Sequence, residues 1–402
     1  MSSNQTIVVK NKGILIFILG LMTALTPFSI DMYLPAFAQM ASEFGSSVSQ
    51  VSLSLSSFFV GLSFGQLIYG PVLDRFGRKR PLYVALSLYV FASLGCMFSD
   101  GPEALMVWRF FQALGGCAMG VASMAMVRDL FDPRESAKVL SLLVLILGAS
   151  PLLAPTIGGA LASHFGWQSL FVVLALMGIS LAVTIVFFLP ETRRPDPSVS
   201  LNPVSVMKGF YHILIHRQFM TYAATVAVAF SGLFAYLAGS PAVFMEHFGV
   251  SEAAYGSIFA IISVGFILSS QVNVQVLKKF SNLQILRTGL VCQSVIAVVF
   301  FFGATQGWFT MVTAVMMFCC FMSCFGFVNP NATAMVMAPF PESAGRASAL
   351  LGFLQMSAGS LMSMAVGIFG IQSLTPLVAL MAITSVSGLV ILAIGSRFIH
   401  RH

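Results

Sequence analysis

Charge is scarce in this sequence, because Asp, Glu, Lys and Arg together make up only 8% of its 402 residues. Soluble domains usually carry about 25% charged residues, so the composition excludes an ordinary soluble protein. Hydrophobic residues make up 58% of the chain. They recur in runs of about 20, long enough to cross a hydrocarbon layer of roughly 30 Å. Because the backbone finds no water in that layer, these runs must be helical, and we expect an all-α polytopic membrane protein.

Several chemical signatures are missing as well. The sequence holds no glycine-rich phosphate loop of the GxxxxGK[ST] kind, which argues against ATP hydrolysis. Its six cysteines fall in the apolar runs without zinc-site spacing to histidines. An H-E-x-x-H motif or paired Asp motif of a membrane enzyme is absent, and so is a channel-type filter. We therefore predict neither an enzyme nor a metal site.

Twelve apolar stretches predict twelve membrane-spanning helices. They lie at roughly 13–39, 48–71, 81–99, 104–129, 136–162, 167–190, 217–245, 252–277, 284–304, 308–336, 346–369 and 374–396. Lys10 and Lys12 precede the first stretch, as in a signal peptide. The apolar run continues well past a signal-peptide core, so we interpret it as a retained span.

Positive charge is confined to one side of the predicted bundle. With the N-terminus inside, the inner loops and tails hold 19 of the 20 Lys and Arg residues, and Arg109 lies within a span. The predicted outer loops hold only acids, namely Glu43, Asp100, Glu103, Glu246 and Glu252. This asymmetry predicts that both termini are cytoplasmic. The net charge of +7 is then a topology signal and does not indicate nucleic-acid binding.

The sequence repeats itself with a shift near 204 residues. EFG at 43–45 matches HFG at 247–249, and Gly61 matches Gly265. Two six-helix halves in the same orientation explain these matches and place a binding site at their interface. A stretch rich in Pro, Ser and charge lies between them. We predict an N-terminal half at 1–190, a cytoplasmic linker at 191–215 and a C-terminal half at 216–402.

The segment FSIDMYLPAF, residues 28–37, contains the only acid of the first span. A charge within a span costs about 2.5–3.5 kcal/mol on insertion scales, so charges kept there are usually functional. Arg109 is the one cation predicted at a similar depth. We hypothesise that Asp31 carries a proton and that Arg109 pairs with its deprotonated form; a static ion pair is the alternative. Pro27 and Pro35 are expected to bend this helix.

Motifs along the chain resemble signatures of one family. GPVLDRFGRKRP at 70–81 is similar to the loop between helices two and three of the major facilitator superfamily. RFFQALGG at 109–116, ASPLLAPTIGG at 149–159 and LPET at 189–192 resemble its helix-four motif, its helix-five antiporter motif and the end of its helix six. DMYLPA at 31–36 and NPNATA at 329–334 resemble the bicyclomycin-resistance (Bcr/CflA) group of drug:proton antiporters. Ala113 and Ala154 replace two glycines that are usual in these motifs.

The resemblance implies a major facilitator fold, alternating access and export driven by the proton gradient without a cofactor. It also implies a latch that closes the inner face in the outward-open state, formed by Gly70, Asp74, Gly77, Arg78 and Asp129. Within this latch we expect Gly70 to allow close helix packing and Gly77 to form a tight turn. Pro151 and Pro155 are expected to bend helix five, which Gly158 and Gly159 weaken further. A simple packing kink is the alternative.

Aromatic and polar residues within the spans are candidates for a cavity lining. The candidate substrate-binding residues are Phe28, Asp31, Tyr33, Phe58, Arg109, Phe234, Tyr236, Tyr255, Phe259, Asn329, Asn331 and Gln355. Flat aromatic faces suit a pocket that accepts many shapes. For the three amides, hydrogen bonds to a neighbouring helix are the alternative role.

Two functions remain open from the sequence. The first is a proton-coupled exporter of small amphipathic drugs. The second is an exporter of a native metabolite, such as an amino acid, a nucleoside or a siderophore, with drug efflux incidental. The APTIGG sequence argues against proton-coupled uptake. The expected partners are the substrate, protons and the lipid bilayer, and the resemblance implies a monomer in the bacterial inner membrane.

Overall fold

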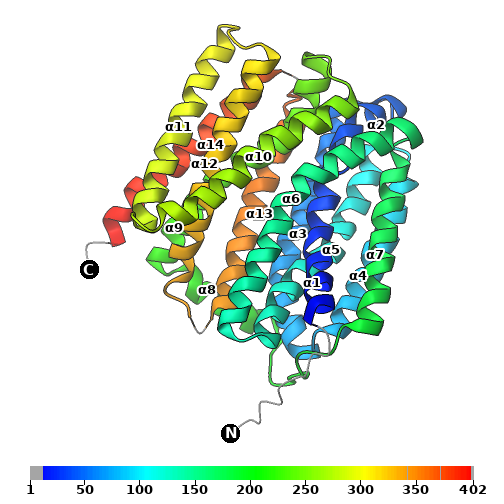
Figure 1. The fold of residues 1–402 in the computed structure, drawn as a ribbon, viewed down its shortest axis with the longest axis vertical. Coiled ribbons are helices and arrows are strands. Elements are labelled where there is room, and N and C mark those ends of the chain that lie inside the picture. Colours follow the sequence, from blue (N-terminus) through cyan, green and yellow to red (C-terminus); the bar gives the residue numbers. More distant parts are fainter. Residues whose placement is uncertain (1–11, 342, 372, 400–402) are drawn as a thin grey trace.

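Long helices lie side by side and make up the body of the protein (Figure 1). The structure, a computed structural model, describes residues 12–341, 343–371 and 373–399. Twelve helical segments in this part of the chain are long and apolar enough to cross a membrane, which confirms the prediction of twelve spans. Lys10, placed before the first span by the sequence, lies outside the described residues.

The first six spans form one group of helices, coloured blue to green in Figure 1. The first span consists of α1 (Lys12–Asp31), the 3-10 turn η1 (Leu34–Ala36) and α2 (Phe37–Glu43). The others are α3 (Val48–Phe76), α4 (Lys79–Met97), α5 (Pro102–Leu130), α6 (Pro133–Phe165) and α7 (Gln168–Phe188). We call these helices the N-terminal half.

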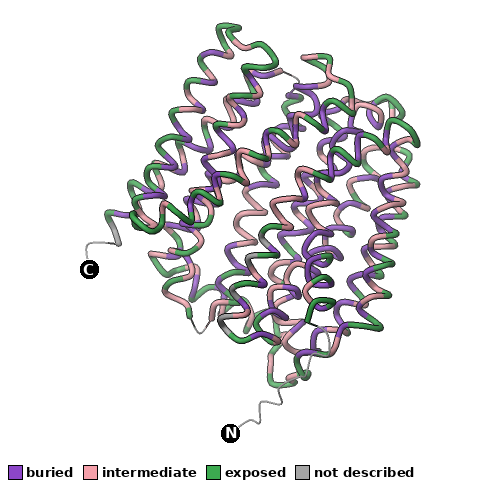
Figure 2. Tube along the Cα trace, viewed as in Figure 1, coloured by how far each residue is buried: buried purple, intermediate pink, exposed green. Residues whose placement is uncertain are grey.

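The last six spans form the second group, the C-terminal half. Its first span is α9 (Arg217–Pro241) with the π-helical turn η2 (Ala242–His247). The others are α10 (Glu252–Val276), α11 (Asn282–Thr305), α12 (Met311–Met337), α13 (Ala344–Ile368) and α14 (Leu374–Ile399). In Figure 2 the buried residues lie largely where helices face one another, and exposed residues cover the outer surfaces that a bilayer would contact.

The sequence repeat appears as the same local geometry in both halves. Gly45 and Gly249 both turn the chain with a positive φ, of 60° and 68°. The serine two residues after each glycine is the N-cap of the next helix, where it accepts a backbone N–H. The repeat therefore encodes the turn and cap that begin α3 in one half and α10 in the other.

The first span breaks directly after Asp31, where the sequence predicted only a bend. In a continuous helix the N–H of residue 35 would donate to the carbonyl of Asp31, but Pro35 has no N–H. The helix ends at Asp31, and Pro35 lies in the turn η1, which begins at Leu34. Pro27 lies within α1. Pro35 therefore favours an end of the helix close to Asp31, the last residue of α1.

The linker contains a helix that sequence reasoning missed. Helix α8 (Pro203–Leu214) is capped by the Asn202 side chain, which accepts the N–H of Val204. Its Phe210 and Ile213 side chains are buried against the C-terminal half. The Pro, Ser and charged residues of this stretch predict a linker but not a helix within it, although Pro at the first turn is compatible with a helix.

The two halves contact one another closely at one end of the bundle. A Cβ at Gly159 of α6 would lie 2.8 Å from the Glu252 carbonyl oxygen of α10. A Cβ at Gly367 of α13 would lie 3.0 Å from the Ser49 carbonyl oxygen of α3. We call this end the acidic side, because Glu43 and Glu252 lie there, and the opposite end, with Lys12 and Arg78, the basic side.

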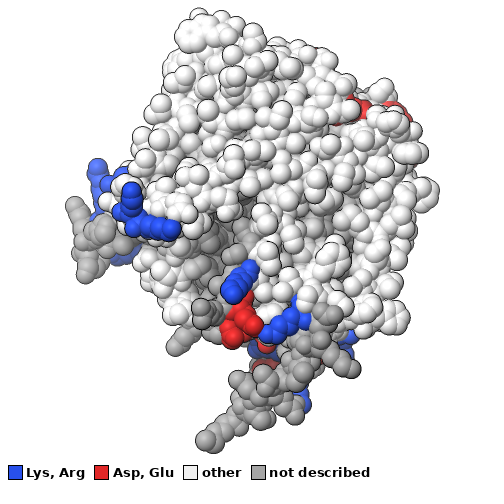
Figure 3. All heavy atoms as spheres, in the orientation of Figure 1, with Lys and Arg blue, Asp and Glu red and all other residues white. Residues whose placement is uncertain are grey.

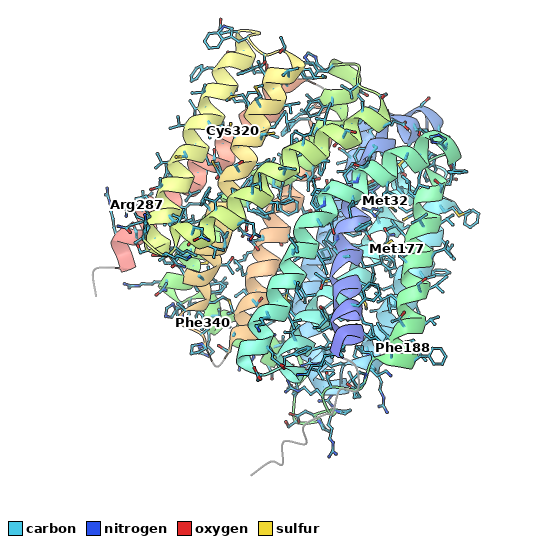
Figure 4. The ribbon with its side chains drawn as sticks, viewed as in Figure 1. Met32, Met177, Phe188, Arg287, Cys320 and Phe340 are labelled. Atoms are coloured by element: carbon cyan, nitrogen blue, oxygen red, sulfur yellow. The ribbon has the colours of Figure 1, made fainter. Side chains whose placement is uncertain are left out.

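Gly158 of the helix-five motif fits against the break in the first span. A Cβ at this position would lie 1.8 Å from the carbonyl oxygen of Met32, which follows Asp31 and is labelled in Figure 4. No side chain fits at that distance, so α6 reaches the end of α1 only because residue 158 is glycine. The glycines of the motif therefore allow close packing in addition to any effect on helix strength.

We predict that Gly158→Ala destabilises the protein by about 1–3 kcal/mol, because the added methyl group must displace the chain after Asp31. Thermal unfolding of the purified protein in detergent measures this change. Gly120→Ala in α5 is the matched control, since a Cβ there meets no atom within 4 Å. The Gly120→Ala variant should be as stable as the wild type, or more stable by up to about 1 kcal/mol. Equal melting temperatures for the two variants would contradict the packing role of Gly158.

Candidate functional site

A cavity of about 1240 Å³ lies between the two halves. Small-molecule pockets usually measure about 300–1,000 Å³, so a drug-sized ligand fits inside it. Arg128 and Asp129 of α5 and Arg346 of α13 line the cavity on the basic side. A hollow is visible beside the charged side chains in the lower part of Figure 3. Since the halves touch on the acidic side, this conformation opens toward the basic side.

Asp31 lies at the closed end of the cavity. It is only 5% exposed and has no hydrogen bond or ion pair within the described part of the chain. Because α1 ends at this residue, the carboxylate stands at the negative end of the helix dipole. A negative charge is poorly stabilised there, so the site favours a proton or another cation beside Asp31.

Arg109 does not pair with Asp31 in this structure, contrary to the pairing that the sequence suggested. It is fully buried, and its guanidinium lies between the rings of Tyr33 and Phe58, 4.1 Å from each centroid. It donates to the Ser29 carbonyl oxygen at 2.8 Å. Its charge is therefore stabilised by two aromatic faces and by the carbonyl end of α1, while its Nε makes no hydrogen bond within the described residues. A similar depth along two helices thus does not by itself make two side chains pair.

A buried hydrogen-bond network holds Arg109 in this position. The Arg109 guanidinium donates to Gln112, whose amide donates to the Ser93 hydroxyl at 2.8 Å. The Ser29 hydroxyl of α1 in turn bonds to the Tyr89 hydroxyl at 2.7 Å. The network joins α1, α4 and α5 beneath the break in the first span. Gln112 belongs to the RFFQ motif, which was the available sequence signal for this network.

The expected latch residues gather on the basic side, all within the N-terminal half. Arg78 bonds to Asp74 at 3.1 Å and to Asp129 at 2.8 Å. Gly77 has a φ of 82°, as a tight turn requires. The close packing expected at Gly70 is not found, because a Cβ there would meet no atom within 4 Å. No ion pair in the described residues joins this cluster to the C-terminal half, which agrees with a basic side that is open.

The end of the sixth span completes this cluster in a way that the sequence did not reveal. The Glu191 carboxylate of the LPET motif accepts the backbone N–H groups of Arg78 and Lys79, at 2.7 and 3.1 Å. These groups begin α4, so Glu191 caps that helix from a distant part of the chain. Thr192 donates to Asp129, and Arg193 pairs with Asp74 at 3.0 Å.

Four of the candidate substrate-binding residues line the cavity, namely Asp31, Phe234, Tyr236 and Phe259. Tyr33, Phe58 and Arg109 instead form the buried stack described above, and Phe28 packs partly buried against the core. Tyr255 is fully buried and bonds to the Ser240 hydroxyl.

The three amides hold helices together and do not line the cavity. Asn331 of α12 donates to Asn273 of α10 at 2.8 Å, and Gln355 of α13 donates to Asn329 of α12 at 3.0 Å. These bonds correspond to the alternative role considered for them.

Sequence reasoning missed most of the lining. Many further residues of the lining are apolar or aromatic, with a few hydroxyl and amide groups, among them Thr23, Thr26, Ile30, Leu62, Gln66, Val121, Met124, Phe230, Leu233, Ile262, Ser263, Phe266, Met322 and Met356. Nothing distinguishes these residues in sequence from the many apolar residues that face lipid. Their position follows only from how the two halves meet.

The Pro and Gly residues of the α6 motif have two roles, lining the cavity and packing closely against other helices. Pro151 lines the cavity, whereas Pro155 is buried and its carbonyl faces Gly256 of α10. Gly158 meets the end of α1, and Gly159 meets α10. Helix α6 thus contacts both Asp31's helix and the opposite half through one short motif.

Residues 19–363 match the family model described as Major Facilitator Superfamily. The chain is 35% identical over 381 residues to an uncharacterized MFS-type transporter, YdgK, of Bacillus subtilis, covering 94% of each chain. It is 29% identical to a bicyclomycin resistance protein homolog of Haemophilus influenzae, and 30% identical to the multidrug resistance protein MdtL of Shigella flexneri. Each of these two alignments covers 92% of both chains.

A crystal structure of a D-xylose-proton symporter has a similar fold. Its TM-score is 0.73, and the alignment covers 94% of this chain and 96% of that one. The sequences are only 14% identical, so this likeness concerns the arrangement of the helices alone.

We predict that Arg109→Lys destabilises the protein by about 2 kcal/mol, because an ammonium group does not stack between two rings as a planar guanidinium does. Thermal unfolding of the purified variant measures the loss. Arg128→Lys is the matched control, since Arg128 is exposed at the mouth of the cavity. If both substitutions lowered the melting temperature equally, the stack would not be the cause.

Proposed function

We propose, from the premise that this chain belongs to the major facilitator superfamily, that it is a proton-coupled exporter of small amphipathic drugs. The chain is a multi-pass membrane protein of a transporter family, and not an enzyme. Two relatives are named for bicyclomycin resistance and for multidrug resistance, which supports a drug as the exported molecule. An exporter of this kind draws on the proton gradient and needs no cofactor.

The observation that carries the proposal is the isolated carboxylate at the closed end of the cavity. Among the residues that the structure describes, Asp31 forms no ion pair, because Arg109 is held by Tyr33, Phe58 and the Ser29 carbonyl. Protonation and binding of a cationic substrate are therefore alternative ways to neutralise the same group. A transporter in which proton and substrate compete for one carboxylate exchanges one for the other across the membrane.

In this mechanism the basic side faces the cytoplasm and the substrate enters from there. The basic residues on that side favour this orientation. Substrate binding at Asp31 would be followed by closure of the basic side and opening of the acidic side, as the halves rock about the cavity. A proton from the outer side would then replace the substrate on Asp31. We further propose that the protein acts as a monomer in the bacterial inner membrane.

The contact between α3 and α13 must change in such a cycle. The Ser56 hydroxyl of α3 lies 2.7 Å from the Ser363 hydroxyl of α13, and the Ser63 hydroxyl lies 3.0 Å from that of Ser357. These side chains belong to opposite halves. They hold together the surfaces that separate when the acidic side opens.

We predict that a disulfide between Ser56→Cys and Ser363→Cys, in a variant lacking the six native cysteines, abolishes export. Oxidation should lock the acidic side closed, and a reducing agent should restore transport. Drug efflux from cells before and after oxidation measures the effect. The two single-cysteine variants are the controls and should be insensitive to the oxidant. Undiminished efflux from the cross-linked protein would rule out movement at this contact.

We predict that the wild-type protein protects a bacterial strain lacking its own efflux pumps, and that Asp31→Asn loses this protection at equal expression. The panel contains phenicols, fluoroquinolones, lipophilic cations and bicyclomycin-like compounds. Asp196→Asn is the matched control, since it removes an acid on the exposed linker. Protection that persists in Asp31→Asn would place the proton site elsewhere. If the wild type protects against no compound, export of a native metabolite becomes the better reading of the same cavity.

A further inference from the structure

Two buried polar side chains line the cavity from opposite halves, and neither makes a hydrogen bond in the part of the chain that the structure describes. One is Asp31 of α1, and the other is Tyr236 of α9. Tyr236 is 2% exposed, and its hydroxyl makes no hydrogen bond of acceptable length and angle within the described residues. The Ser240 hydroxyl is its neighbour and bonds to the Tyr255 hydroxyl at 2.8 Å.

The two groups belong to one place in the cavity. Asp31 and the Tyr236 hydroxyl interact electrostatically. The turn η1, which follows Asp31 closely in sequence, packs against both α9 and α10. The Tyr236 ring is stacked on Phe259 of α10, with centroids 5.6 Å apart and an angle of 27°. This stacking restrains the ring and so limits the positions that its hydroxyl can take.

The chemistry of the two groups is complementary and specifies a ligand. A carboxylate needs a cation, and the basic residues lining the cavity lie at its mouth, where Arg78 and Arg193 are already paired with acids. A phenol hydroxyl needs an acceptor, because a buried donor left unpaired is unfavourable. Aromatic side chains, among them Phe230, Phe234 and Phe266, form the surrounding wall. These rings accommodate an apolar body and favour a nearby cation.

We propose that Asp31 and Tyr236 together bind a protonated amine that carries an ether, hydroxyl or carbonyl oxygen a few bonds from its nitrogen. The ammonium donates to the Asp31 carboxylate, and the oxygen accepts from the Tyr236 hydroxyl. The apolar part of the ligand lies against the phenylalanine wall. This inference rests on the proposed function, since it names the substrate class of the same cavity.

Two probe compounds of equal charge and nearly equal size separate the two contacts. The first is the diphenylmethyl ether of N,N-dimethylaminoethanol. The second is N,N-dimethyl-4,4-diphenylbutylamine, in which a CH₂ group replaces the ether oxygen. Isothermal titration calorimetry on the purified full-length protein in detergent measures their dissociation constants. The wild type should bind the ether about 3- to 10-fold more tightly, as expected for one net hydrogen bond.

Variants assign this preference to single atoms. Tyr236→Phe should bind the ether only as tightly as the carbon analogue and should leave the analogue's affinity unchanged. Tyr255→Phe is the matched control, because it removes a hydroxyl that already bonds to Ser240. This variant should still bind the ether more tightly than the carbon analogue. Asp31→Asn should raise the dissociation constants of both amines at least about 10-fold, because it removes the charge that both ammonium groups need.

Three outcomes would overturn the inference: equal binding of the two compounds to the wild type, an unchanged preference in Tyr236→Phe, or binding of neither amine. The first needs no variant, so it stands even if a substitution impairs folding. These outcomes are distinct from failure of the proposed function. A protein that binds neither amine but protects cells from uncharged drugs is still an exporter, with a different substrate class.

Discussion

The missing backbone N–H of Pro35 is the constraint on which the rest of the site depends. It leaves the Asp31 carbonyl without its helical partner and favours the end of α1 close to that residue. The chain that follows runs close to α6, where only glycine at position 158 leaves space for the Met32 carbonyl oxygen. The carbonyl of Ser29, in the last turn of the helix, is bonded by Arg109. A proline, a glycine and an arginine from three spans thus position one carboxylate.

The division of charge within the cavity follows from the same arrangement. Arg109 stabilises the end of α1 from inside the N-terminal half, on the side away from the cavity lining. The carboxylate is consequently left alone at the closed end, while Arg128 and Arg346 line the open end. A ligand entering from the basic side passes from a region of positive charge to a negative group in an aromatic setting. Such a gradient selects for molecules that combine a cationic group with an apolar body.

The sequence was sufficient for the fold because the governing signals are long and periodic. The apolar runs each extend over about 20 residues, and the repeat at EFG and HFG occurs once in each half. Parts of the site could be named from the sequence where one residue differs from its surroundings, as Asp31 does, or where a motif is present, as for Arg78. The partner of Arg109 could not be predicted, because helical depth does not determine which way a side chain points. Asn331 illustrates the same limit. A polar residue within a span can line the cavity or form a hydrogen bond to a neighbouring helix, and the sequence looks the same in both cases.

The linker has a mechanical consequence for how widely the cavity can open. Its first part is fastened to the N-terminal half, where Arg75 donates to the carbonyl oxygens of Pro197 and Val199. Its second part, α8, is packed on the C-terminal half. Only the short segment between Val199 and Pro203 connects the two, and at full extension it spans about 14 Å. While Arg75 keeps its bonds, this segment is a tether that sets the largest gap between the halves at that edge of the mouth, however large the substrate.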